Sequence, residues 1–225
     1  MPALSASTVR GSIQLVESRD PNVRRNSDYS GVVVWLERAD GAPAPTPPRT
    51  ATMIQRKKMF TPHVLAVPVG ATVDWPNLDP IFHNAFSNFS GQPFDVGLYP
   101  PKTSQKVVFR REGVVRVFCN IHPTMSAVIV VVRTPYVAVS SRTGEFSIEN
   151  VPPGVYRLRI FHERSLESTL SALEQRVTVA AAPVTVSRIA ISESGYLQAP
   201  HSNKFGKDYP PVVEDQAMYY AGRKP

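Results

Sequence analysis

The sequence centres on one stretch, Cys119-Asn120-Ile121-His122-Pro123-Thr124-Met125. It holds the single cysteine of the chain, a histidine three residues later and a methionine three residues after that. Apolar and β-branched residues flank it, so it is expected on a loop between two strands, 114–119 and 127–133. Thiolate, imidazole and thioether suit copper, and a trigonal His₂Cys site with a long axial Met is one known arrangement. The stretch contains three of those four ligands.

The composition predicts β-structure in one large or two small domains. The chain has 225 residues, of which 42% are hydrophobic, and this is enough for a packed core. Twenty-two prolines, with many Val and Thr residues, favour strands and loops over long helices. The net charge of +7 is scattered rather than interleaved with aromatic residues. We therefore expect attraction to acidic partners. The sequence contains no nucleic-acid-binding motif.

The chain has neither the pattern of a membrane span nor that of a signal peptide. Its longest apolar run, 127–132, is far shorter than the roughly 20 residues that a spanning helix needs. The first ten residues contain no charged region followed by an apolar segment. A single cysteine also excludes an intrachain disulfide.

Alternating and continuous apolar patterns predict strands through most of the chain. They are expected at 8–17, 31–37, 51–59, 63–69, 72–75, 104–109, 114–119, 127–133, 145–148, 156–160, 177–179 and 184–191. Residues 19–30 are polar and are expected to form a loop, and the proline-rich stretch 40–48 is expected to be a domain boundary. Leucines at helical spacing predict one short helix within 165–175.

Residues 60–132 resemble the cupredoxin family. The resemblance rests on two blocks, Phe60-x-Pro62…Gly70-x-x-Val73-x-Trp75-x-Asn77-x-Asp79…His83-Asn84 and Cys119-x-x-His122-x-x-Met125. The two-residue gap between His122 and Met125 is the short form that amicyanin has, and Pro123 matches as well. The resemblance implies a Greek-key β-sandwich for this part of the chain.

The resemblance also implies the ligands of one mononuclear type 1, or blue, copper site. His83, Cys119 and His122 would be the equatorial ligands, and Met125 the weak axial ligand. The residue after the first histidine, Asn84, would connect the two ligand loops. Phe118, next to the cysteine, would provide an exit route for electrons, although a role in packing fits it equally well.

Other interpretations of these residues remain open. Cys119 could be an inert buried thiol and Met125 a core residue. Zinc bound by one cysteine, two histidines and water is the main alternative metal site, and a methionine at this spacing argues against it. The remaining histidines are not expected to be ligands: His63 lies in an expected strand, and His162 and His201 are expected on the surface.

Residues 135–191 resemble a transthyretin-like or carboxypeptidase-regulatory-like β-sandwich. The motif that carries this resemblance is Thr143-Gly144-x-Phe146…Val151-Pro152-Pro153-Gly154-x-Tyr156-x-Leu158. Two earlier segments, beginning at Gly11 and Gly31, look like the first strands of such a module. We therefore expect a discontinuous domain of residues 8–40 and 135–191. The cupredoxin domain, 50–133, would be inserted into it or packed beside it, and 192–225 would form an irregular tail.

The combined pattern is similar to that of methylamine-utilisation-type cupredoxin proteins, and it implies one-electron transfer rather than enzymatic catalysis. The partner would be a redox donor or acceptor, such as a cytochrome or a periplasmic redox enzyme, and the protein would be periplasmic or otherwise exported. Two alternatives are a copper chaperone or storage protein, and a structural or binding module without a redox role. An enzyme of the multicopper oxidase or nitrite reductase type needs further histidine clusters, and five scattered histidines do not provide them.

Overall fold

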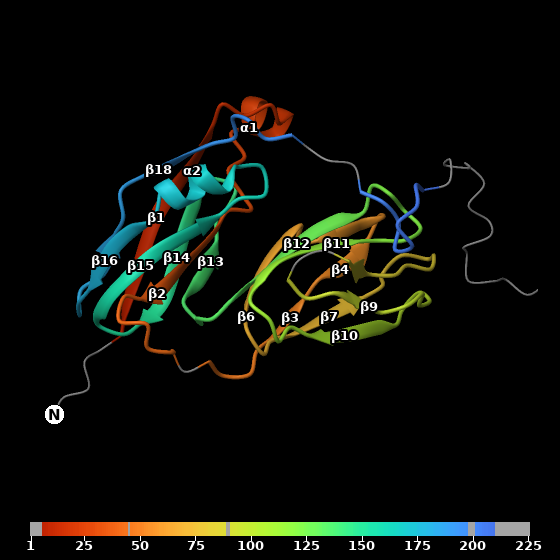
Figure 1. The fold of residues 1–225 in the computed structure, drawn as a ribbon, viewed down its shortest axis with the longest axis horizontal. Coiled ribbons are helices and arrows are strands. Elements are labelled where there is room, and N and C mark those ends of the chain that lie inside the picture. Colours follow the sequence, from red (N-terminus) through yellow and green to blue (C-terminus); the bar gives the residue numbers. More distant parts are fainter. Residues whose placement is uncertain (1–5, 45, 89–90, 198–200, 210–225) are drawn as a thin grey trace, which may run out of the picture. The chain divides into compact units, whose positions relative to one another are not determined.

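The computed structural model describes residues 6–44, 46–88, 91–197 and 201–209, and this part of the chain is almost entirely β (Figure 1). The described residues contain two helices, α1 (Pro21–Asn26) and α2 (Glu167–Ala172), each of 6 residues. The prediction of an all-β fold is confirmed. In the part of the chain that the structure describes, no helix is long and apolar enough to cross a membrane.

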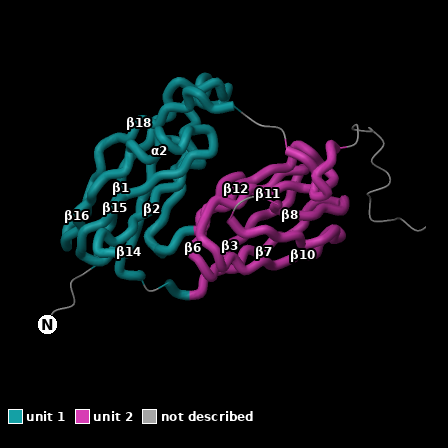
Figure 2. The backbone as a smooth tube through the Cα atoms, viewed as in Figure 1, with its two compact units in different colours: residues 1–47, 132–198 teal, residues 48–131, 199–225 magenta. Residues whose placement is uncertain are grey.

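The chain divides into two compact units (Figure 2). Unit 1 comprises residues 1–47 and 132–198, and unit 2 comprises residues 48–131 and 199–225. Each unit has its own cluster of buried apolar side chains. The metal-ligand candidates identified from the sequence all lie in unit 2.

Unit 1 contains two sheets whose inner faces share one core. The first has the order β14 (Glu145–Val151), β1 (Ser7–Val16), β17 (Val184–Thr185), and β18 (Ile189–Ser192) also pairs with β1. The second has the order β13 (Val137–Val139), β2 (Val33–Arg38), β15 (Gly154–Phe161), β16 (Gln175–Val179). Strands from both ends of the chain pair directly, since Gly11 lies opposite Phe146 and Leu36 opposite Leu158. Unit 1 therefore exists only when both segments are present.

Unit 2 is a second sandwich of two sheets, beside which β4 (Ile54–Arg56) and β5 (Met59–Thr61) pair as a separate two-stranded sheet. One sheet has the order β10 (Ser104–Val108), β7 (Thr72–Pro76), β3 (Thr50–Thr52). The other has the order β6 (Val64–Pro68), β12 (Ser126–Val132), β11 (Gly113–Phe118), β8 (Phe86–Ser87), β9 (Phe94–Asp95). Fully buried Trp75 lies between the rings of Phe60 and Phe94, at centroid distances of 5.8 and 5.7 Å. This aromatic packing joins the sheets beneath the ligand loops.

Three local predictions were wrong. The strand expected at 184–191 is divided into β17 and β18. The expected loop at 19–30 contains α1, whose first turn is capped by the Asp20 side chain and whose last residue is followed by Ser27 with a φ of 49°. Only Val23 of this helix is buried, so the sequence shows no helical periodicity. The single strand expected at 51–59 is instead divided into β3, β4 (Ile54–Arg56) and the start of β5 (Met59–Thr61). Lys57 and Lys58, with φ values of 54° and 55°, form the turn between β4 and β5.

The short helix predicted within 165–175 is present as α2. It ends at Ala172 because strand β16 begins at Gln175 and pairs with β15. Leu170 on its inner face is buried in the core of unit 1.

We predict that Gly144→Ala destabilises unit 1 far more than Gly41→Ala. Both glycines have positive φ, 84° and 73°, so each substitution carries the left-handed backbone penalty of about 1–2 kcal/mol. A methyl group at 144 would lie 2.1 Å from the Ile13 carbonyl oxygen, whereas one at 41 meets nothing within 4 Å. Overpacking should add roughly 1–3 kcal/mol at Gly144 alone. Urea unfolding measures the free energy of unfolding of both variants. Equal losses would show that the close approach of residue 144 to Ile13 adds no cost.

Candidate metal centre

Three buried side chains of unit 2 direct their ligand atoms at one point. The Cys119 sulfur lies 3.9 Å from His83 Nδ1 and 3.6 Å from His122 Nδ1. All three atoms lie within 4.8 Å of one another. The exposed fractions of the three residues are 0% for His83 and Cys119 and 7% for His122. Residues 36 positions apart in the chain thus form one cluster that is shielded from water.

The loop between β11 and β12 is closed by its own backbone. The Cys119 N–H donates to the Met125 carbonyl oxygen at 3.2 Å, and the Met125 N–H donates to the His122 carbonyl oxygen at 3.0 Å. These bonds place the cysteine and histidine side chains on the same side of a tight turn. Met125 is fully buried and belongs to the same core cluster as Cys119.

His83 is held on its own loop from two sides. Its backbone forms an isolated bridge with Tyr99, with bonds of 3.3 and 2.9 Å. Its ring nitrogen Nε2 lies 2.8 Å from Asp79 Oδ2. Because a carboxylate accepts and His83 Nε2 must donate to it, the lone pair of the neutral ring is on Nδ1 and faces Cys119. Asp79 thus fixes both the orientation and the tautomer of His83.

The tight turn between β4 and β5 holds the Asp79 carboxylate in place. Its two carboxylate oxygens accept from the N–H groups of Lys57 at 2.6 Å and Lys58 at 2.8 Å. Although burial opposes ionisation, the Lys58 N–H, the His83 ring and the Lys57 N–H hold the pKa of Asp79 below its usual value. Asp79 was part of the sequence motif but had been given no role. Its spacing of four residues before His83 was the available signal.

Burial disfavours the charged form of both imidazoles. It lowers the pKa of His83, and together with the neighbouring His83 ring and Lys58 it lowers the pKa of His122 to about 4. Burial raises the pKa of the Cys119 thiol. Neutral imidazoles provide lone pairs, and a bound cation would favour the thiolate by displacing its proton.

This donor set fits a soft or borderline cation. Among the described residues, neither Nδ1 atom has a hydrogen-bond partner other than the Cys119 sulfur. Two nitrogens and one sulfur that face a common point, with a buried thioether on the same loop, are ligands that copper accepts. His83, Cys119 and His122 are the residues that would hold such an ion.

Asn84 links the two loops that contain these residues. Its Oδ1 atom accepts from the Asn120 N–H at 2.5 Å, and its Nδ2 atom donates to Asp95 Oδ1 at 3.2 Å. Asn84 itself is 2% exposed, and both of these bonds are partly buried. The positions of the His83 loop and the Cys119 loop are therefore coupled directly.

Phe118 packs beside the site at the end of β11. It is 6% exposed and lies against Phe86, with ring centroids 6.1 Å apart. On its other side it stacks on His201, with centroids 3.9 Å apart and an interplanar angle of 23°. His201, expected as a surface residue, is thus in contact with the neighbour of the cysteine. Sequence reasoning had no signal for this, because the two residues are remote in the chain.

The other two histidines lie outside the cluster. His63 is exposed, and its Nδ1 atom lies 3.0 Å from the Ser126 carbonyl oxygen. His162 was expected on the surface, and this was wrong, since it is 2% exposed. Its Nε2 atom lies 2.8 Å from Glu193 Oε1, and Arg164 contacts the same carboxylate at 3.0 Å. This paired cluster allows a polar ring to be buried in unit 1.

Comparison with known proteins gives partial structural matches. No family model and no curated protein matches the chain. It is similar to a purple cupredoxin from Nitrosopumilus maritimus, with 29% identity over 36% of this chain and 98% of the other, at a TM-score of 0.34. An amicyanin variant in the Cu(I) form matches at 21% identity over 36% of this chain and 81% of the other, at a TM-score of 0.35. A copper-containing nitrite reductase from Thermus scotoductus matches at 26% identity over 54% of this chain and 28% of the other, at a TM-score of 0.37.

The metal-free protein should lose stability as the pH falls from about 6.5 to about 4. Over that range the unfolded chain binds a proton at His122 while the folded chain does not, because the folded pKa is lowered from 6.5 to about 4. The unfolded state therefore gains about 3 kcal/mol from this residue. Urea unfolding at several pH values measures the loss, and His122→Asn should show a shallower dependence. An identical pH dependence in both proteins would contradict the buried neutral imidazole.

Replacing Asp79 with Asn should weaken metal binding without removing a ligand. Whichever way the amide is turned, its nitrogen faces at least one N–H group that the carboxylate accepts from, and its uncharged oxygen is a weaker acceptor, so His83 is held less firmly. Loss of a partner of this kind typically lowers metal affinity 10–100-fold. Competition with a chelator measures the affinity, and Asp74→Asn, on β7, is the control. Equal affinities in the two variants would show that Asp79 does not position His83.

Proposed function

We propose that the protein is a one-electron carrier with a single type 1 copper ion, held by His83, Cys119 and His122 in the equatorial plane and by Met125 in the axial position. The observation that carries the proposal is the convergence of two neutral imidazole nitrogens and one thiol at a buried point. Copper bound by these residues would supply one-electron chemistry by alternating between its +1 and +2 states.

The surrounding residues suit electron transfer because they resist rearrangement. The Cys119 loop is closed by two backbone hydrogen bonds, and Asp79 holds His83 in one tautomer. A site that keeps its geometry in both redox states needs little reorganisation when the charge changes. Exposed fractions of 0–7% at the three ligands also leave little room for a substrate, which supports a carrier rather than an enzyme.

The remaining parts of the proposal concern location and partners. We propose an exported, periplasmic protein that exchanges electrons with another redox protein. The net charge of +7 favours a partner with an acidic face. Unit 1, whose β1 and β2 pair with strands after residue 137, would be a transthyretin-like scaffold or docking module.

The test is to add Cu(II) to the purified protein and measure its visible spectrum. We expect one equivalent of copper to produce an intense thiolate-to-copper absorption towards the red end of the spectrum. Cys119→Ser and His122→Ala should abolish it, whereas His63→Ala should leave it unchanged. A colourless copper complex, or an intense band that persists in Cys119→Ser, would refute the proposed site.

The axial ligand and the role as a carrier need separate measurements. Met125→Leu should change the reduction potential, and Met53→Leu, also fully buried in the same core cluster, is the matched control. A reversible potential and fast electron self-exchange are expected of a carrier. Slow exchange combined with rapid transfer of copper to an acceptor protein would instead favour a copper chaperone.

A further inference from the structure

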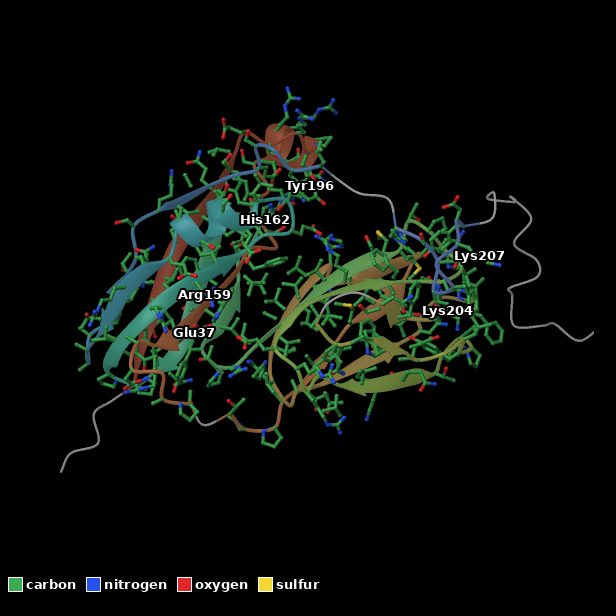
Figure 3. All side chains as sticks on the ribbon, viewed as in Figure 1. Glu37, Arg159, His162, Tyr196, Lys204 and Lys207 are labelled. Atoms are coloured by element: carbon green, nitrogen blue, oxygen red, sulfur yellow. The ribbon has the colours of Figure 1, made fainter. Side chains whose placement is uncertain are left out.

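The chain returns to the metal centre near its C-terminal end. Residues 201–209, called the strap below, belong to unit 2, although residues 132–198 before them belong to unit 1. The strap is the blue segment of unit 2 in Figure 1, and two of its residues, Lys204 and Lys207, are labelled in Figure 3. It forms neither a helix nor a strand.

The strap makes three hydrogen bonds to the loop that contains the cysteine. They join the Tyr209 hydroxyl to the Cys119 carbonyl oxygen at 2.9 Å, His201 Nε2 to the Pro123 carbonyl oxygen at 2.8 Å, and the Lys204 N–H to Asn120 Oδ1 at 3.0 Å. The first two bonds end on the backbone of a proposed ligand and of the residue that follows one. The strap thus holds the first two residues of the 119–125 loop and its fifth residue, Pro123.

Ring contacts add to these bonds. The His201 ring stacks on Phe118, at a centroid distance of 3.9 Å, and meets Tyr209 edge to face at 5.3 Å. The two strap rings therefore stay in place against the loop.

The strap is also fixed to the loops around His83. The Lys204 ammonium lies 2.8 Å from Asp95, and the same carboxylate accepts from the Asn84 side chain. Asn88 donates to the Lys204 carbonyl oxygen at 3.0 Å. Within the strap, Asn203 closes a turn by donating its N–H to the Lys207 carbonyl oxygen at 2.8 Å. The strap therefore contacts the Cys119 loop directly and reaches the His83 loop through Asp95, so it acts as a brace between them.

We propose that the strap positions the ligand loop before the metal arrives, with Tyr209 and His201 as the positioning residues. The inference rests on the proposed copper site, because it concerns the geometry of that site. A hydroxyl directed at the carbonyl of the cysteine ligand also places positive charge near the sulfur. This favours the electron-rich Cu(I) state, as hydrogen bonds around a copper thiolate do in general.

The first test uses the metal-free, full-length protein. Cys119 is the single cysteine, so its alkylation by iodoacetamide reports only on this loop. Tyr209→Phe removes one hydrogen bond and should raise the alkylation rate roughly fivefold. The double variant with His201→Phe, which keeps an aromatic ring at 201, should raise it by more than roughly tenfold. Tyr196→Phe is the control and should alkylate at the wild-type rate, because the described residues include no hydrogen-bond partner for the Tyr196 hydroxyl.

A second variant removes a strap contact by changing the Cys119 loop instead of the strap. Asn120→Ala removes the side-chain acceptor of the Lys204 N–H and leaves the strap unchanged in sequence. It should also speed alkylation several-fold. Circular dichroism and the urea midpoint test whether each variant is folded. If the double variant does not fold, the alkylation rates of Tyr209→Phe and Asn120→Ala test the proposal. Wild-type alkylation rates in both folded variants would overturn the proposal.

Experiments on the copper-loaded protein test the role of the strap independently of the proposed function. Tyr209→Phe should have a lower reduction potential than the wild type and should release Cu(I) to a chelator several-fold faster, whereas Tyr196→Phe should change neither. The protein could be blue while Tyr209→Phe leaves its reduction potential, copper release and alkylation rate unchanged. That result would overturn the positioning role of the strap and leave the copper function standing. A colourless copper complex, together with faster alkylation in the metal-free variants, overturns the copper function and supports positioning of the loop.

Discussion

The candidate metal centre depends on one short hydrogen bond between two loops, from the Asn120 N–H to Asn84 Oδ1. One loop contains His83 and the other contains Cys119 and His122, and neither could form a three-ligand cluster alone. The acceptor residue Asn84 is 2% exposed, so little water competes for its side-chain oxygen. Around it, the bonds of Asp79 to the β4–β5 turn, the closed 119–125 turn and the strap each fix one side of the cluster.

The arrangement of the chain gives this centre a sandwich of its own. Unit 1 is built from strands before residue 40 and after residue 137, and unit 2 from the strands between them together with the strap. The aromatic core around Trp75 supports the loops from inside, and the strap supports them from outside. The ligand cluster is thus enclosed by contacts within unit 2, and rigidity of this kind suits the one-electron role that we propose for it.

Several features could not be predicted, and each depends on contacts between distant residues. His162 has no sequence signal for burial, because its partners Glu193 and Arg164 are identified only by the fold. Helix α1 is too short to show periodicity, although Asp20-Pro21 is a typical start. The strap was expected to be an irregular tail, which describes its backbone but not its position. Its residues 201–209 contact a loop that is about 80 positions earlier in the chain.

The sequence by itself determined the all-β class, the position of most strands and the types of ligand available. Side-chain alternation is local, so the pattern around Val73 or Leu158 predicts a strand without knowledge of its partner. The spacing of Cys119, His122 and Met125 likewise predicts one turn with donors on it. Only the tertiary structure decided that His83 meets this turn, that Asp79 sets its tautomer and that Tyr209 covers it. Those contacts depend on how the sheets of unit 2 bring distant loops to the same end of the sandwich.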